Sequence, residues 1–241
     1  MRGFFMKENF DADTLVRSFL SEKNIKAAIF DLDGTIVDNN AFHLKTWEKY
    51  LAVKNLTISE ENYRRYINGR TNKDAIEYLY KRSMSDEEAM TYALEKEAMY
   101  RELYAPHIKP LNGLIEWLAA LKKQQIKIGM ATSGIPANID FLFEHVPIRS
   151  YFDAVIHSGH ISKGKPDPEI YIKTAEALGI SPQQCMAFED AAVGISSAKA
   201  AGMMVLAVTT TQTVEELQQA DYISADFSEA ALAKAFSAKL T

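Results

Sequence analysis

The chain of 241 residues has a single cysteine, Cys185, so no disulfide can form within it. Chains without such bonds are typical of reducing compartments, and we therefore expect a cytoplasmic protein. The sequence also lacks any run of roughly 18 apolar residues, the length that a membrane-spanning helix needs. Residues 1–10 lack the long apolar core and the small-residue cleavage pattern of a secretory signal, so we expect neither export nor a membrane partner.

Basic residues are in the minority, because the formal net charge is −5 and no stripe of lysine or arginine stands out. This balance argues against nucleic acid as a partner. It does not exclude an anionic small molecule, which needs only a local cationic pocket. Internal repeats and low-complexity tracts are absent, and the 47% apolar content is that of an ordinary globular enzyme, which we expect to be a monomer.

After residue 110, helical segments alternate with short apolar runs. The predicted strands cover residues 26–31, 126–131, 153–157, 185–188 and 203–208. The predicted helices cover residues 112–123, 136–144, 168–178, 191–201, 213–219 and 228–238. Gly179 and Gly202 fit the left-handed residue that follows a helix end. The alternation predicts an α/β fold with a Rossmann-like parallel sheet as its core.

The segment 39–105 has a different character, because it is rich in Tyr, Glu, Lys and Met at helical spacing and has no β-branched runs. Four helices are predicted in it, over residues 39–54, 59–68, 72–83 and 86–104. We interpret this segment as an inserted cap domain, with the α/β core formed by residues 25–38 and 106–241. Residues 1–24 then form an N-terminal extension with a short amphipathic helix over 11–24.

Two carboxylates, Asp31 and Asp33, follow the first predicted strand. If the strand alternation continues, both point the same way and repel each other. A bound Mg²⁺ would relieve this repulsion, since it prefers oxygen ligands. One carboxylate can then attack phosphorus while the other transfers protons. An Asp-rich turn around Gly34 is an equally good interpretation of this fragment taken alone.

Polar residues also follow two other predicted strands. Thr132 and Ser133 can donate hydrogen bonds to phosphate oxygens, or instead cap the next helix. Glu189 and Asp190 can complete a metal site, although Asp190 could also be a helix cap. Lys165 lies between these motifs and is either a phosphate-binding ammonium or a surface lysine. Because ligands bind at the carboxyl ends of parallel strands, the coincidence of these residues predicts one site.

Four motifs, 31–35 (Asp-Leu-Asp-Gly-Thr), Thr132, Lys165 and 189–190 (Glu-Asp), occur in an order that resembles the haloacid dehalogenase-like (HAD) superfamily. The resemblance covers residues 25–225 and points to the helical-cap branch that contains β-phosphoglucomutases and related phosphatases. It implies that Asp31 is the nucleophile that accepts the phosphoryl group and that Asp33 is the acid/base. Thr132 would hold the phosphoryl group and Lys165 would neutralise its charge.

The same resemblance implies that Mg²⁺ is bound by Asp31, Glu189 and Asp190, together with the main-chain carbonyl of Asp33. It also implies that the main chain of Ser133 and Gly134 helps to bind the phosphoryl group. The second aspartate argues against dehalogenation, because a halide leaving group needs no proton.

The loop around Gly69 resembles the specificity loop of this branch. Gly69 lets the backbone approach a ligand closely, and Arg70 and Lys73 could bind a second anionic group such as a distal phosphate. The alternative is a loop of solvated charges. His43 matches a histidine of β-phosphoglucomutases that helps to gate the acid/base, although a core or surface histidine in the first cap helix is an equally good interpretation. Asn72 stands where that subfamily has its phosphate-binding arginine.

We therefore expect Mg²⁺-dependent phosphoryl transfer through Asp31, with hydrolysis of a small phosphorylated metabolite, most simply a sugar phosphate, as the first hypothesis. The alternative is β-phosphoglucomutase activity, in which a sugar hydroxyl rather than water receives the phosphoryl group. A catalytically silent binding module is a minor alternative, and the intact set of polar residues argues against it.

Overall fold

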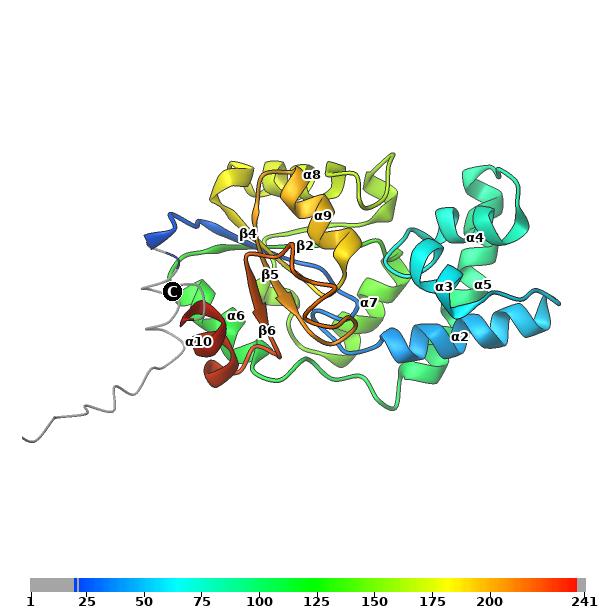
Figure 1. The fold of residues 1–241 in the computed structure, drawn as a ribbon, viewed down its shortest axis with the longest axis horizontal. Coiled ribbons are helices and arrows are strands. Elements are labelled where there is room, and N and C mark those ends of the chain that lie inside the picture. Colours follow the sequence, from blue (N-terminus) through cyan, green and yellow to red (C-terminus); the bar gives the residue numbers. More distant parts are fainter. Residues whose placement is uncertain (1–19, 21, 238–241) are drawn as a thin grey trace, which may run out of the picture.

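The computed structural model describes residue 20 and residues 22–237. At its centre is a six-stranded parallel sheet with the strand order β3-β2-β1-β4-β5-β6 (Figure 1). The strands are β1 (Ala27–Phe30), β2 (Lys127–Ala131), β3 (Ala154–Ile156), β4 (Cys185–Glu189), β5 (Met204–Val208) and β6 (Tyr222–Ser224). The predicted α/β fold with a Rossmann-like parallel sheet is confirmed.

Helices cover both faces of this sheet (Figure 1). One face carries α8 (Glu169–Leu178) and α9 (Ala192–Ala200), and the other carries α6 (Leu114–Lys123), α7 (Pro136–His145) and α10 (Glu229–Ser237). Side chains alternate along β1, so Ala28 and Phe30 join one core cluster and Ala27 and Ile29 join the other. Strands buried on both faces explain the short, continuous apolar runs of the sequence.

Four helices form the cap, beside the sheet in Figure 1: α2 (Asn40–Val53), α3 (Glu60–Tyr66), α4 (Asn72–Tyr80) and α5 (Asp86–Tyr104). The cap has its own apolar core, which includes Trp47 and Ile76. Ser59, Thr71 and Ser85 accept hydrogen bonds at the starts of α3, α4 and α5, which explains why these helices begin there. The assignment of residues 39–105 to a separate domain stays a prediction.

Two sequence predictions fail near the carboxyl end of the chain. Residues 213–219 form turns rather than the predicted helix. The hydrogen bond from Leu217 N to Thr213 O spans one turn that is not continued, and a single turn is too short to offset the cost of helix nucleation. Strand β6 was not predicted, because three residues are too few to show a periodicity. The predicted helix over 11–24 falls largely outside the described residues.

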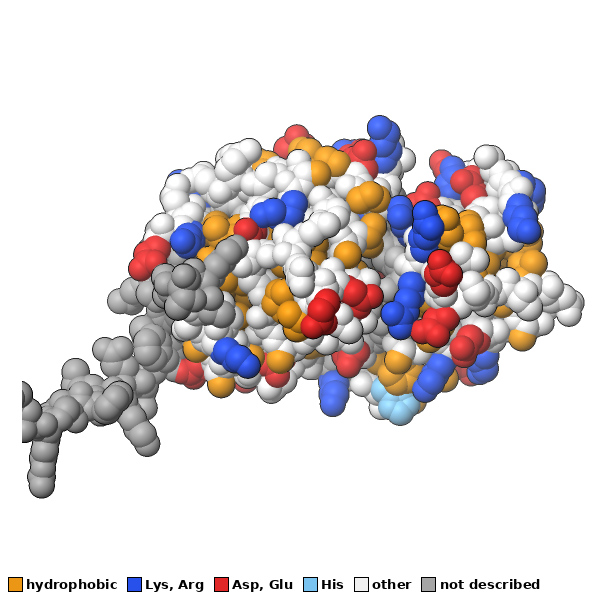
Figure 2. Space-filling view, in the orientation of Figure 1, with side chains coloured by type: hydrophobic (Ala, Val, Ile, Leu, Met, Phe, Trp, Pro, Cys, Tyr) orange, Lys and Arg blue, Asp and Glu red, His pale blue; other side chains and the backbone are white. Residues whose placement is uncertain are grey.

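The cap lies next to the carboxyl ends of β1, β2 and β4, and side chains from both parts line a pocket between them. Basic and acidic side chains gather along the seam where the two parts meet on the face shown in Figure 2. No helix within the described ranges has both the length and the apolar character that crossing a lipid bilayer would require.

Candidate active site

The centre of the candidate site is Asp31, which follows β1 directly. β1 pairs in parallel with β2 on one side and with β4 on the other, with Phe30 opposite Met130 and Phe188. Asp31 N donates a hydrogen bond to Phe188 O at 3.0 Å, which continues the ladder past the end of β1. This register places Asp31 between the residues that follow β2 and those that end β4, as expected for strands whose carboxyl ends share one edge.

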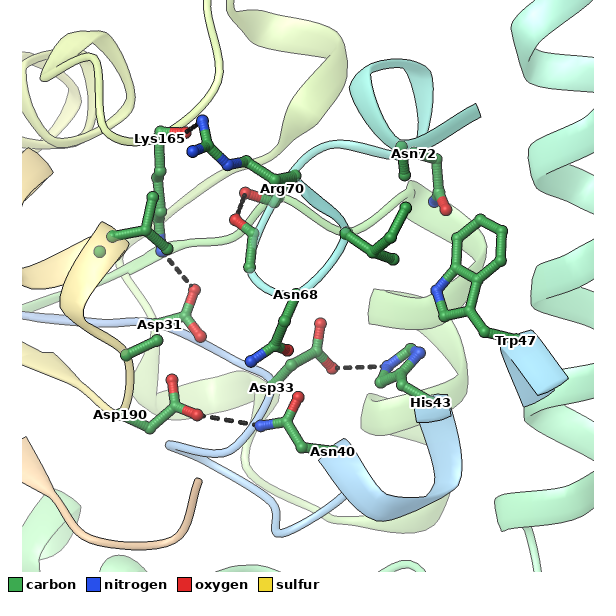
Figure 3. Close-up of a pocket in the computed structure, with 18 of the residues that line it drawn as sticks. Asp31, Asp33, Asn40, His43, Trp47, Asn68, Arg70, Asn72, Lys165 and Asp190 are labelled. Carbon is green, nitrogen blue, oxygen red and sulfur yellow. Dashed lines mark hydrogen bonds and ion pairs between the residues drawn. The ribbon is translucent and has the colours of Figure 1, made fainter. Parts of the chain in front are cut away.

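Lys165 reaches this edge from the loop before α8. Its side chain is 3% exposed, and its Nζ lies 2.6 Å from both Asp31 Oδ1 and Glu189 Oε1 (Figure 3 shows the contact with Asp31). Tyr171 Oη donates a further hydrogen bond to Glu189 Oε1 at 2.6 Å. Lys165 is therefore a buried, fully engaged ammonium rather than a surface lysine.

Three buried carboxylates, Asp31, Glu189 and Asp190, offer oxygen atoms that all lie within 4.8 Å of one another. Burial raises the pKa of Asp31 to about 8, and although Lys165 opposes this, Glu189 adds to it. Burial also raises the pKa of Asp190 well above its usual range, with Glu189 as the next cause. The negative charge of the cluster exceeds what one ammonium can balance, and an all-oxygen donor set of this kind fits a hard divalent cation.

Glycines leave the space that these carboxylates occupy. A Cβ on Gly34 would lie 2.0 Å from Asp190 Oδ2, and a Cβ on Gly194 would lie 2.0 Å from Glu189 Oε1. Asn40 Nδ2 donates a hydrogen bond to Asp190 Oδ2 at 2.9 Å. Helix α9 has no side-chain cap, so Asp190 does not serve as its N-cap, and the alternative interpretation from the sequence is excluded.

The second aspartate, Asp33, faces the cap. Asn39 Nδ2 donates to Asp33 Oδ1 at 2.6 Å, and His43 Nε2 lies 3.4 Å from the same oxygen. Burial acts to raise the pKa of Asp33, but His43, Asn39 and Lys96 outweigh it and hold this pKa below its usual value. These partners therefore favour the charged form of Asp33. A bound phosphate would add negative charge nearby and favour its protonation.

The contacts of His43 define which ring nitrogen carries the proton. Lys96 Nζ lies 2.9 Å from His43 Nδ1, and because an ammonium can only donate, Nδ1 must accept. The ring therefore carries its hydrogen on Nε2, on the side of Asp33. Tyr100 stacks on the ring with centroids 3.8 Å apart, which fixes its plane. His43 thus positions Asp33.

The residues after β2 include Thr132, Ser133 and Gly134, which the sequence predicts to bind the phosphoryl group. Ser133 and Gly134 line the pocket together with Asp31 and Lys165. Thr132 is fully buried and its Oγ1 accepts a hydrogen bond from Gly134 N at 2.9 Å, so it shapes the turn. Neither Thr132 nor Ser133 caps α7, because the N-cap position is Ile135 and no side chain caps this helix.

The cap loop is seated on the core. Arg70 Nη1 donates to Lys165 O at 3.1 Å, and Ser133 Oγ donates to Gly69 O at 3.3 Å. Gly69 has a φ of 72°, and a Cβ there would lie 2.7 Å from a methyl carbon of Val193 on α9. Glycine is therefore needed both for the turn and for the close approach of the loop to the core.

Among the predicted residues of the cap, His43, Gly69 and Arg70 line this pocket, whereas Lys73 does not. Its Nζ pairs with Asp86 Oδ1 at 2.5 Å, and its side chain is 42% exposed. It faces a neighbouring groove that is lined by residues such as Asp74 and Ser162. Arg70, in contrast, lines the pocket beside Lys165 (Figure 3).

Sequence reasoning missed several polar residues of the pocket, namely Asn40, Lys96, Glu97 and Asn138. One signal was available for Lys96 and Glu97, because they share a helical face with small and aromatic residues that become buried, Ala89, Ala93, Tyr100 and Tyr104. Charged residues on the apolar face of an amphipathic helix are rarely buried without a partner.

Core and cap together enclose a cavity of about 70 Å³. This volume holds several water-sized groups, so it suits a small ligand. Figure 3 shows Asp31, Asp190 and Lys165 on one side of the pocket and Trp47 and His43 on the other, with Asp33 between them. The arrangement combines a carboxylate beside a buried ammonium, a cluster of three buried carboxylates and a second aspartate held by Asn39 and His43.

Comparison with known proteins agrees with this chemistry. A family model described as haloacid dehalogenase-like hydrolase matches residues 28–208. β-Phosphoglucomutase from Bacillus subtilis (strain 168) is 32% identical over 192 residues, which cover 76% of this chain and 83% of that protein. Fructose-1-phosphate phosphatase YqaB from Escherichia coli (strain K12) is 30% identical over 175 residues, covering 73% of this chain and 92% of that protein.

A solved structure shows the same fold. The crystal structure of β-phosphoglucomutase from Clostridium difficile matches with a TM-score of 0.76 and 26% sequence identity. The match covers 90% of this chain and 99% of that chain, so it includes the sheet and the cap.

Proposed function

The chain belongs to the haloacid dehalogenase-like hydrolase family, and on this basis we propose that it is a Mg²⁺-dependent phosphatase that hydrolyses a small phosphate monoester. The substrate class that we propose is a sugar phosphate, as in the name of the Escherichia coli relative. The observation that carries the proposal is Asp31, which lines the pocket and whose carboxylate lies 2.6 Å from the buried ammonium of Lys165.

In the first step, a carboxylate oxygen of Asp31 attacks phosphorus and the bond from phosphorus to the ester oxygen breaks. The leaving oxygen takes a proton from Asp33, so the alcohol departs as a neutral molecule. Lys165 offsets the negative charge that Asp31 and the phosphoryl oxygens bring together. The product of this step is an aspartyl phosphate.

In the second step, a water molecule gives a proton to Asp33 and attacks the phosphorus of the aspartyl phosphate. The bond to Asp31 breaks, and inorganic phosphate leaves. Asp33 has already given its proton to the leaving oxygen in the first step, so its carboxylate is free to accept one from water. Asn39 and His43 hold its carboxylate in place for both steps.

Asp31, Glu189 and Asp190 would hold Mg²⁺, together with the main-chain carbonyl of Asp33, because they form the buried oxygen cluster of the pocket. When bound, the ion neutralises charge on the phosphoryl oxygens. The raised pKa values of Asp31 and Asp190, caused first by burial, support a site that needs a further positive charge.

β-Phosphoglucomutase activity is a second candidate, in which a sugar hydroxyl receives the phosphoryl group from Asp31. Two observations favour it: the cap loop is seated on the core through Arg70, and His43 contacts Asp33. A seated cap restricts the entry of water, and the balance between water and a sugar hydroxyl decides between the two activities.

A panel of phosphate esters separates these candidates. We expect release of inorganic phosphate from p-nitrophenyl phosphate and from sugar monophosphates with Mg²⁺, and none with a chelator. Incubation with β-glucose 1-phosphate and a trace of the 1,6-bisphosphate tests the mutase, because glucose 6-phosphate would then accumulate. The absence of turnover on every ester would leave the silent binding module as the better description.

We also propose that the protein acts in the cytoplasm as a monomer. Cys185 is buried, and burial raises the pKa of its thiol to about 12, which fits a cysteine that stays reduced and unreactive. The large apolar side chains exposed in the described ranges are few and spread over the molecule: Val53 on α2, Met90 and Leu94 on α5, Ile115 on α6 and Val214 in a loop. Light scattering on the purified chain tests the monomer.

A further inference from the structure

The cap side of the pocket is built around a buried carboxylate, Glu97, which is 3% exposed. Asn72 Nδ2 donates to its Oε1 at 2.9 Å, and Asn138 Nδ2 donates to its Oε2 at 2.8 Å. Lys96 Nζ also donates to Oε1 at 2.9 Å. These residues come from α4, α5 and α7, and all of them line the pocket, so Glu97 is part of the wall that a substrate meets.

The positive charge at the cap side belongs to Lys96, which is already paired with Glu97. Lys96 Nζ contacts Glu97 Oε1 and His43 Nδ1, and it lies 4.9 Å from the centre of the Trp47 ring. Burial acts to raise the pKa of Glu97, but Lys96, with the hydrogen bond from Asn138, outweighs it and keeps this pKa below its usual value, so Glu97 is charged. The pair has no net charge, and no other lysine or arginine of the described residues lines this side of the pocket.

The other cations that line the pocket belong to the opposite side. Lys165 pairs with Asp31 and Glu189. Arg70 donates to the main chain of Lys165, and Figure 3 shows it next to that residue and away from His43 and Trp47. The cationic groups are therefore placed for one phosphoryl group, at the core side.

We propose that Glu97 determines substrate specificity by excluding a second phosphate and favouring a neutral group that carries hydroxyls. This inference rests on the proposed phosphatase function. A second phosphate would lie beside the buried carboxylate of Glu97 with no cation to pair with, because Lys96 already pairs with Glu97. Repulsion between two anions is strongly unfavourable at short range. A hydroxyl can instead donate to Glu97 or to Asn72 Oδ1, which accepts no hydrogen bond from any described residue.

This inference differs from the expectation that Arg70 and Lys73 bind a distal phosphate. Lys73 pairs with Asp86 outside the pocket, and Arg70 lies at the end where the transferred phosphoryl group would bind. The substrate class is thus narrowed to monophosphates of sugars or polyols, whose far end is uncharged.

The test compares initial rates of phosphate release from matched substrates, fructose 1-phosphate against fructose 1,6-bisphosphate and glucose 6-phosphate against glucose 1,6-bisphosphate. We expect wild-type kcat/KM to favour a monophosphate over its bisphosphate by at least about tenfold. In Glu97→Gln, which keeps the shape but removes the charge, this preference should fall by about tenfold or more. Equal use of both substrates by the wild type overturns the inference, whether or not the variant folds.

Glu95→Gln is the matched control, because Glu95 lies on the same helix, pairs with Lys54 at 2.7 Å and has a side chain that is 44% exposed. It should keep the wild-type preference, and loss of the preference in both variants would overturn the role of Glu97. An unchanged preference in a folded Glu97→Gln variant overturns it as well.

p-Nitrophenyl phosphate separates the two proposals: its turnover with Mg²⁺ supports the phosphatase independently of Glu97. No turnover of any ester overturns the phosphatase, and the inference with it.

Discussion

Buried charges occur at both sides of the pocket, but they are balanced differently. At the core side, Asp31, Glu189 and Asp190 share one ammonium, and burial raises the pKa of Asp31 to about 8. At the cap side, Glu97 pairs with Lys96, and its pKa stays low in spite of burial. A cluster with excess negative charge favours the binding of a cation, whereas a neutral ion pair does not favour the binding of a further ion. The core side is therefore suited to a metal ion and a phosphoryl group, and the cap side to a neutral group.

The largest effect should come from Asp31→Asn, because the nucleophile is lost. We expect kcat on p-nitrophenyl phosphate to fall by about 10⁴-fold or more. The melting temperature should not fall, since burial makes the charged form of this carboxyl unfavourable in the fold. Turnover close to that of the wild type in this variant would remove Asp31 from its proposed role.

Asp33→Asn should lower the rate by about 10²- to 10⁴-fold, the usual contribution of a general acid or base. The loss should be greater for alkyl phosphates than for aryl phosphates, because a poor leaving group depends more on the proton. Rates measured on one ester of each kind check this. An equal loss on both would contradict the acid role and would leave Asp33 with a structural or metal-binding role.

Asp190→Asn tests whether the carboxylates at the core side of the pocket bind Mg²⁺. In the wild type, Mg²⁺ at 100 times its dissociation constant should stabilise the fold by about 2.7 kcal/mol. The variant should lose most of this stabilisation, and its melting temperature without Mg²⁺ should be no lower than that of the wild type. Asp167→Asn, outside the cluster, serves as the control. A full Mg²⁺ effect in Asp190→Asn would show that the ion binds elsewhere.

The smallest effect is expected for Asp153, a core carboxylate away from the pocket. It accepts hydrogen bonds from Ile128 N at 2.8 Å and Lys122 Nζ at 2.9 Å. Burial acts to raise its pKa, but these partners lower it overall. Its contribution to stability is therefore present above the unfolded-state pKa and lost as the pH falls through the folded-state pKa.

Asp153→Asn should cost about 1 kcal/mol of unfolding free energy at pH 7. Urea denaturation at pH 7 and near pH 3 measures whether the difference shrinks on acidification, as the sign of the shift requires. A difference that grows at low pH would contradict the assigned direction. Activity should be unchanged, which separates this structural carboxylate from those of the pocket.

The core side of the pocket could be predicted from the sequence, because its residues follow apolar strands directly. Asp31, Thr132 and Glu189 lie at the ends of runs whose composition alone indicates parallel strands, and such strands must bring their carboxyl ends together. The sequence does not decide between the two interpretations of Lys165, or between those of Asp190. A surface lysine or a helix cap differs from a buried ligand only in the contacts that folding makes.

What the sequence by itself determined was the alternation of helices with the strands β1 to β5 and the polar residues at the strand ends, since these depend on local periodicity. The tertiary structure alone decided that Glu97 and Lys96 face the pocket and that Lys73 turns to Asp86. These outcomes depend on how four cap helices pack against each other and against the core. A helical face lines a pocket only when another element packs against part of it. The sequence pattern of one helix does not indicate which element that is.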